Sequence, residues 1–103
     1  MIDNGFYIGS DLKLRIDITA PGFDQYGDDY TIDLYCDDEL SKSFTQDDVR
    51  LSDGHFYLPI PSEGLKPGML RIVVTALVPD SDFPDGIRKE IAVNRLKYLK
   101  KIL

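Results

Sequence analysis

Glycine and proline divide this sequence into short segments, and the spacing of these turn signals constrains the fold more than any other feature. The two residues cluster at residues 21–22, 59–61, 67–68 and 84–86, with single glycines between the clusters. Because both residues favour turns and disfavour helix interiors, long helices have little room. Ten Ile and five Val against three Ala also favour strands, since branched side chains suit a pleated surface. We therefore expect mostly β-strands.

Apolar and polar side chains alternate with a period of two in several segments, which is typical of half-buried strands. The clearest alternation runs over residues 12–18, and Pro59 marks one further segment as an edge strand or a strand lacking a ladder bond. Residues 69–78 are apolar on both faces, with Val73 and Leu77 on the second face, so this strand should be central or face a partner. The other expected strands cover residues 30–36, 41–44, 55–60 and 87–93.

Two segments carry other local signals. Thr45 can cap at most one helical turn, because its hydroxyl can accept from the free amide of Asp48. From Asn94 onwards the alternation is lost, and Leu96 and Leu99 fit a helical stripe while Leu96 and Tyr98 equally fit a continued strand. The conformation of residues 94–103 is therefore left open.

Six or seven short strands separated by turns predict an immunoglobulin-like antiparallel two-sheet sandwich, with a small barrel as the second choice. At 103 residues the chain should form a single β-sandwich domain, 1–103. An N-terminal arm, residues 1–9, and a basic C-terminal segment, residues 94–103, would flank it. The single Cys and the absence of Trp rule out the disulfide and tryptophan of antibody domains.

The charge of the chain is unevenly spread. The net charge is −6, which repels phosphate backbones and argues against nucleic-acid binding. Residues 1–54 carry −9 and residues 55–103 carry +3, an asymmetry that could guide assembly. No apolar run is long enough for a membrane span, and no secretory signal is visible at the start, so we expect synthesis in the cytoplasm and no membrane partner.

No residue pattern indicates catalysis. Asp80, Asp82 and Asp85 form the densest carboxylate loop and are a weak calcium candidate, because the third acid falls one place late for an EF-hand and Pro84 interrupts the loop. The cysteine, Cys36, is interpreted as a buried small hydrophobe, and the lone His55 has no evident catalytic partner. We therefore expect no enzyme activity, no cofactor and no metal.

Several apolar and aromatic residues are candidates for contacts with other molecules. Phe6, Tyr7 and Ile8 form an apolar patch on the arm, which we expect to dock on a sheet edge of its own or a neighbouring subunit. Tyr35 and Tyr57 lie on the polar faces of their strands, where they could contact a subunit, pack across strands or, with Tyr26, stack on a sugar.

The tail is also an interaction candidate. Residues 87–103 carry six cations against Glu90 alone, together with the apolar residues Leu96, Leu99, Ile102 and Leu103. We expect this segment to dock against an acidic surface, in its own N-terminal half or in another subunit, with the apolar residues holding the contact and the charges orienting it. A solvated, frayed end is the alternative.

Residues 9–14, 65–70 and above all 78–88 give the chain a resemblance to small β-sandwich proteins of prophage and mobile elements in gut bacteria, found in tail or baseplate gene neighbourhoods. This resemblance implies a virion or assembly component that binds its neighbours and has no catalytic residue. The leading hypothesis is thus a noncatalytic structural or interaction module that forms a homo-oligomer or hetero-assembly. A carbohydrate- or cell-surface-binding module that uses the tyrosines and acidic loops is the alternative.

Overall fold

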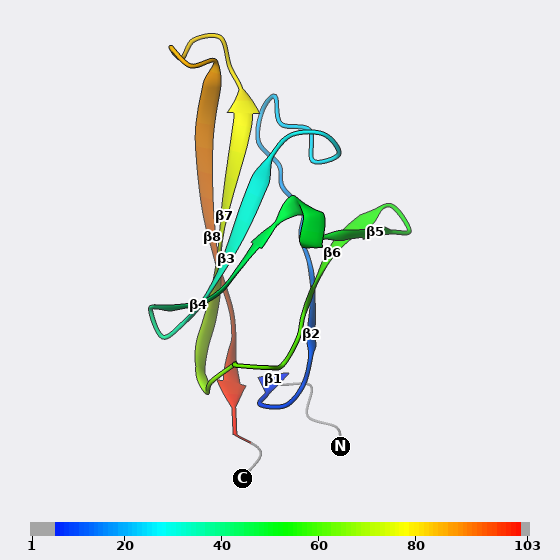
Figure 1. Cartoon of the computed structure of the whole chain (residues 1–103), viewed down its shortest axis with the longest axis vertical. Helices are drawn as coiled ribbons and strands as arrows, with labels where there is room; N and C mark the ends of the chain where they lie inside the picture. The colour runs from blue at the N-terminus through cyan, green and yellow to red at the C-terminus, as the bar shows by residue number, and fades with distance from the viewer. Residues whose placement is uncertain (1–5, 102–103) are drawn as a thin grey trace.

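The chain folds into two β-sheets that face each other, as Figure 1 shows. A computed structural model describes residues 6–101. Sheet A has five strands in the order β1-β8-β7-β3-β4, and sheet B has three in the order β2-β6-β5. The strands are β1 (Phe6–Tyr7), β2 (Leu12–Arg15), β3 (Tyr30–Cys36), β4 (Glu39–Thr45), β5 (Arg50–Ser52), β6 (His55–Ile60), β7 (Gly68–Pro79) and β8 (Ile87–Lys100).

The prediction of an all-β chain with two sheets is confirmed. The sole helical segment among the described residues is a single 3-10 turn, η1 (Gln46–Asp48), which Thr45 caps by accepting from the amide of Asp47 while Asp48 accepts from the amide of Thr45. Within residues 6–101, no helix has the length and apolar character needed to cross a bilayer.

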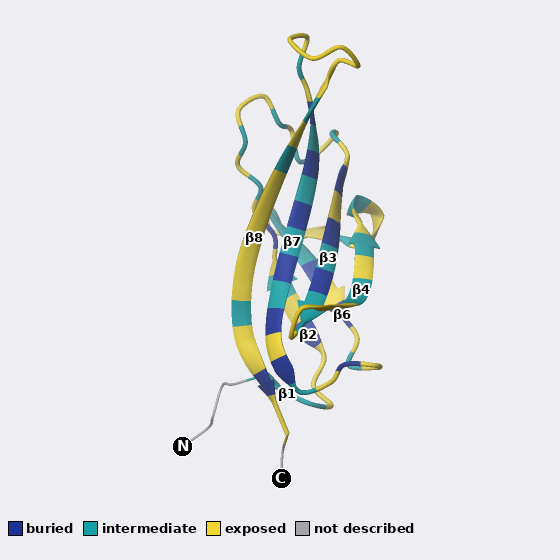
Figure 2. Cartoon of the chain, turned by 90° about the vertical axis from the view of Figure 1, so that its left-hand side faces the viewer, coloured by how far each residue is buried: buried dark blue, intermediate teal, exposed yellow. Residues whose placement is uncertain are grey.

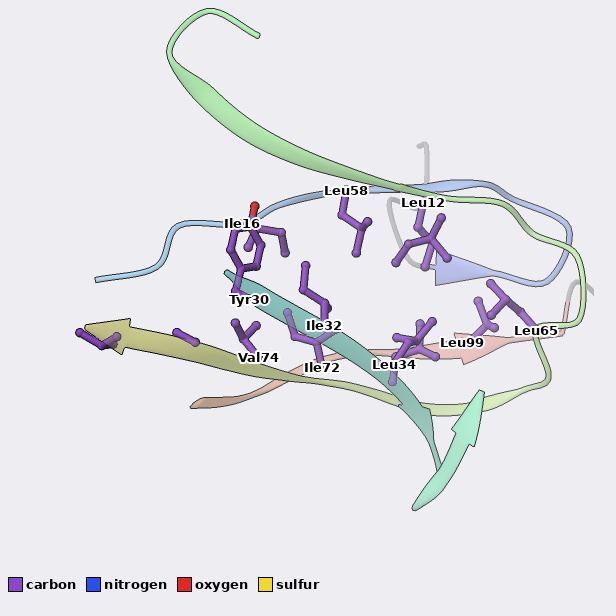
Figure 3. Packing of buried hydrophobic residues seen from close by; sticks show 14 residues of the cluster. Leu12, Ile16, Tyr30, Ile32, Leu34, Leu58, Leu65, Ile72, Val74 and Leu99 are labelled. Atoms are coloured by element: carbon purple, nitrogen blue, oxygen red, sulfur yellow. The ribbon is translucent and has the colours of Figure 1, made fainter. Parts of the chain in front are cut away.

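The core lies between the two sheets and is built from the inward side chains of alternating strands. Figure 3 shows Leu12 and Leu58 of sheet B facing Ile32 and Ile72 of sheet A across this core. Strand β7 lies between β8 and β3 and turns five side chains inward, all of them buried: Leu70, Ile72, Val74, Ala76 and Val78. The predicted central position and inner face of this strand are therefore confirmed.

The first alternating segment forms a shorter strand than its pattern predicts. Strand β2 ends at Arg15, although the amide of Ile16 still donates to Phe56 O at 2.8 Å. Beyond Ile16 the backbone bonds to the Gln25 side chain in place of a neighbouring strand. Gln25 donates to Ile16 O and accepts from the amide of Ile18. The burial of alternate side chains nevertheless continues through Ile18.

Two further expectations about the strands are corrected. Residues 6–101 form eight strands rather than six or seven, and the sheets are not wholly antiparallel, because β1 pairs in parallel with Leu99 and Lys100 of β8. Strand β8 also runs through residues 94–100, so the helical alternative for this segment is wrong.

A bulge in β8 explains why the alternation fades there. Met69 pairs with Tyr98 while Arg71 pairs with Arg95. Between these two pairs β8 therefore contains one residue more than β7. An extra residue shifts the phase of a strand by one position. Even-numbered residues of β8 therefore face inward before the bulge, and Leu99 faces inward after it.

The start of β7 requires glycine. Gly68 has a φ of +151°, and a Cβ there would lie 2.5 Å from Asp37 Oδ2 and 2.7 Å from Cys36 Sγ. Asp37, in the β3–β4 turn, accepts from the amide of Met69 at 2.9 Å and donates its own amide to Met69 O. This close approach ties the turn of one hairpin to the first residues of the central strand.

Candidate functional site

The outer face of sheet A carries a stripe of exposed apolar side chains. We define the outer face by the side chains of β7 and β8 that point away from the core. Across the two strands Val73 pairs with Val93 and Thr75 with Ile91. Ile91 is 62% exposed and Val93 56% exposed, although both lie in the middle of a long strand. Figure 2 shows β8 as an almost continuous exposed band beside β7, whose residues are alternately buried.

Cationic and aromatic side chains border this stripe. Lys89 lies opposite Leu77, and at the other end Arg71 lies opposite Arg95. The guanidinium of Arg71 is 3.2 Å from Asp38 Oδ1 and 5.0 Å from the ring centre of Tyr35. An apolar centre with a charged rim is the usual composition of a protein interface.

The predicted arm candidates contact their own chain. Phe6 pairs with Leu99 and Tyr7 with Lys100, and the amide of Ile8 donates to Lys100 O at 2.8 Å. Phe6 and Ile8 also pack against the core. The arm therefore docks in cis on the C-terminal end of β8.

The tail candidates also belong to the fold. Leu99 is fully buried, so it is a core residue and is not available as a contact for a partner, and Leu96 packs half-buried against the same core. Within the described residues this segment contacts the apolar arm, with Lys97 Nζ 5.6 Å from the ring centre of Phe6. Docking on an acidic surface stays a prediction. Residues 1–5 of the arm and the tail candidates Ile102 and Leu103 lie outside the described residues.

The tyrosine candidates do not form one platform. Tyr35 projects from the outer face of sheet A, whereas Tyr57 belongs to β6 in sheet B, where Lys13 Nζ lies 5.1 Å from the ring centre. Tyr26 packs edge-on against Phe56, with the ring centres 4.9 Å apart. The structure therefore separates Tyr35 from the other two tyrosines.

The carboxylate loop is organised by its own chain. Asp80 Oδ2 accepts from Arg88 Nη1 at 2.6 Å, and Asp80 Oδ1 accepts from the amide of Asp82. The amide hydrogen bond, followed by the hydrogen bond from Arg88, lowers the pKa of Asp80. Asp85 instead accepts from the amide of Ile87. Across residues 6–101, no group of three metal-ligating side chains comes together.

The cysteine and histidine candidates have structural neighbours. Cys36 is half-buried rather than fully buried and donates to Lys66 O at 3.3 Å. Burial, and then the charge of Asp37, raises the pKa of its thiol, which disfavours the reactive thiolate. His55 packs edge-on against Tyr57 at 6.5 Å between ring centres.

An open cleft lies beneath β8, where sheet B does not extend far enough to cover sheet A. It has a volume of about 380 Å³ and is bounded on one side by residues 15–20. On the other side lie Ile72 and Val74 of β7, and Ala92 and Asn94 of β8. Its lining combines apolar side chains with polar and charged ones, among them Arg15, Asp17 and Glu90.

The sequence interpretation placed Val73 and Leu77 on a face that could meet a partner but missed Ile91 and Val93. The missed signal was that residues 87–93 carry their large apolar side chains, Ile87, Ile91 and Val93, at odd positions, opposite the second face of β7. No protein-family model matches this chain, and no curated protein or solved structure matches it either, so its function has to be inferred from its own residues.

Proposed function

We propose that this chain is a noncatalytic structural module that binds other protein subunits through the outer face of sheet A. The observation that carries this proposal is the exposure of Ile91 and Val93 in the middle of a strand, next to Val73. Soluble proteins rarely leave a contiguous apolar stripe uncovered, and such a stripe commonly marks an interaction site.

The rim supports the same function. Lys89 and Arg95 place cations at the two ends of the stripe, and the chain as a whole is acidic. Such charges steer a partner and fix its orientation, while the apolar centre supplies most of the binding free energy. By contrast, the acids Asp37 and Asp80 hold turns of their own chain together.

The assembly that we propose is a phage-like tail or baseplate, into which the chain would be incorporated after synthesis in the cytoplasm. The support is the resemblance carried by residues 78–88. Most of this segment forms the loop between β7 and β8, and Arg88 anchors it by donating to Asp80, Glu90 and Pro21 O. The loop therefore has a defined shape that a neighbouring subunit could recognise.

We also propose that the two sheets form an immunoglobulin-like sandwich. In that fold one sheet has the order G-F-C-C′ and the other contains B-E-D. The orders β8-β7-β3-β4 and β2-β6-β5 correspond to these two sheets strand by strand.

Site-specific photo-crosslinking tests the proposed surface. A photoreactive phenylalanine at Val73, on the outer face, should crosslink to one protein in the host that makes this chain, and excess unlabelled chain should compete. The matched control places the same group at Tyr57, which is half-buried on the other sheet. Equal crosslinking from both positions, or none from Val73, would contradict the proposal.

A carbohydrate-binding module is the second candidate, because Tyr26 is 70% exposed and stacking on sugars uses exposed aromatic rings. A glycan array with the purified chain separates the two functions. Saturable binding to several related glycans that is lost in Tyr26→Ala and kept in Val73→Glu would favour this alternative.

A further inference from the structure

The longest open strand edge of the described molecule belongs to β8. Strand β1 covers β8 only at Leu99 and Lys100, so no described strand pairs with residues 87–96 on that side. The other sheet edges are short or interrupted: β2 has four residues, β5 has three, and β4 contains a bulge at Ser41. Long, regular edges invite another strand to pair with them.

The hydrogen-bond phase shows which backbone groups of β8 point outward. At the end of the hairpin the amide of Asp80 donates to Gly86 O at 2.9 Å, which makes these two residues a hydrogen-bonded pair. Such pairs recur at every second residue of an antiparallel ladder. Even-numbered residues of β8 therefore bond to β7, and the amides and carbonyls of Lys89, Ile91 and Val93 point to the open edge.

We propose that a second copy of this chain adds its own β8 antiparallel to this edge, about a two-fold axis at Ile91. This inference concerns the open edge of the strand rather than the outer face and goes beyond the proposed function. In this register Ile91 meets Ile91 of the second copy, and Lys89 meets Val93, so the outward backbone groups of the two strands match. The result is one continuous sheet across both copies.

The side chains favour this register. The outward positions of β8 read Ile87, Lys89, Ile91, Val93 and Arg95. With the axis at Ile91, each cation lies opposite an apolar side chain, on which its methylene stem can pack. Moving the axis to Ala92 would instead place Lys89 directly opposite Arg95, where the like charges repel.

The cleft gives the added strand a place for its inner side chains. Inward-pointing residues of the second β8 would project beneath the edge, next to Ala92 and Asn94, which line the cleft of about 380 Å³. Ala92 is exposed there, so the edge is not blocked by a bulky side chain. Arg88 is already neutralised by Asp80 and Glu90.

The remaining cations predict an unusual dependence on salt. Lys89 and Arg95 of two copies place four positive charges near one another on the joined sheet. Salt screens such repulsion, with a screening length of about 10 Å at 0.1 M. Dimerisation should therefore tighten as salt rises, whereas pairing with an acidic strand of a different protein would weaken.

Sedimentation equilibrium of the full chain over a concentration series, at about 0.05 and about 0.5 M NaCl, tests the proposal. The mass should rise from 11.7 kDa toward twice that value, at lower concentration in the higher salt. Lys89→Pro removes an outward amide without breaking the β7 ladder and should stay monomeric. The control Lys89→Ala keeps the amide and should dimerise more tightly, because it loses a cation.

Three results would overturn the proposed dimer. They are a monomer at every concentration up to about 1 mM, equal dimerisation of Lys89→Pro and Lys89→Ala, or dimerisation that weakens with salt. None of them affects the crosslinking from Val73, which decides the proposed function separately.

Amide exchange in the unmodified chain provides a second measurement that does not depend on the proline variant folding. The amides of Ile91 and Val93 should exchange more slowly as the concentration rises, while Ala92, already bonded to β7, should change little. Unchanged exchange at Ile91 would also overturn the dimer.

Discussion

Strands β7 and β8 are consecutive arms of one hairpin and are similar in length, yet they differ in what they contribute. Strand β7 lies between two neighbours and buries every second side chain along its length. Strand β8, with fourteen residues, buries Leu99 alone and exposes Ile91 and Val93. The apolar side chains of the two strands thus have different roles: those of β7 fill the core, and those of β8 form an exposed surface.

Truncating one isoleucine on each strand tests this difference most strongly. Ile72→Ala should lower the free energy of unfolding by about 2–4 kcal/mol, because Ile72 is 4% exposed and the change leaves a cavity. The matched variant Ile91→Ala removes the same atoms from an exposed position and should cost less than about 1 kcal/mol. Urea unfolding of both gives the comparison, and equal losses would show that the two strands do not divide these roles.

The glycines at the starts of the two strands, Gly68 in β7 and Gly86 just before β8, offer a second comparison. Gly68→Ala should cost about 2–3 kcal/mol, because a Cβ there meets Asp37 and Cys36 in addition to the backbone strain. Gly86, with a φ of +76°, has no atom within 4 Å of a Cβ, so Gly86→Ala should cost only about 1 kcal/mol. Thermal melts would contradict this if Gly86→Ala were the less stable variant.

Removing the arm should destabilise the chain at Leu99, the one buried residue of β8. Deleting residues 1–8 uncovers Leu99 and removes the packing of Phe6 and Ile8, so we expect a loss of about 2 kcal/mol and a lower melting temperature. The full-length double variant Phe6→Ala/Ile8→Ala should reproduce much of this loss. An unchanged melting temperature in both would show that the arm does not stabilise the chain.

The smallest expected effect concerns pH at the loop that joins the two strands. The pKa of Asp80 is lowered in the folded state by the amide of Asp82 and by Arg88, so its contribution to stability is present above its unfolded pKa and is lost as the pH falls through the folded value. Below about pH 4 the melting temperature should therefore fall slightly more in the parent chain than in Asp80→Asn. If the melting temperatures of the two chains fell equally with pH, Asp80 would not contribute to the pH dependence of stability.

Local alternation was enough to predict β3, β6 and β7, because each of these strands has one face in the core and keeps its phase throughout. In β8 it predicted only residues 87–93, because the bulge opposite Leu70 shifts the phase beyond them. It also could not tell the exposed apolar face of this strand from a buried one. The pairing of Phe6 with Leu99 joins opposite ends of the chain and has no local signal. For the same reason the sequence placed Leu99 among the contact residues, although it is in the core.

The parallel pairing of β1 with β8 also determines how the molecule would carry a mechanical load. If the chain were pulled from the two ends, the force on β1 would act backwards along that strand and the force on β8 forwards along its own. Because the strands are parallel, these forces slide one strand past the other, and the bonds between them, such as that from Ile8 to Lys100, are loaded together rather than one after another. Tension along the chain would therefore meet a shear contact before it reached the core.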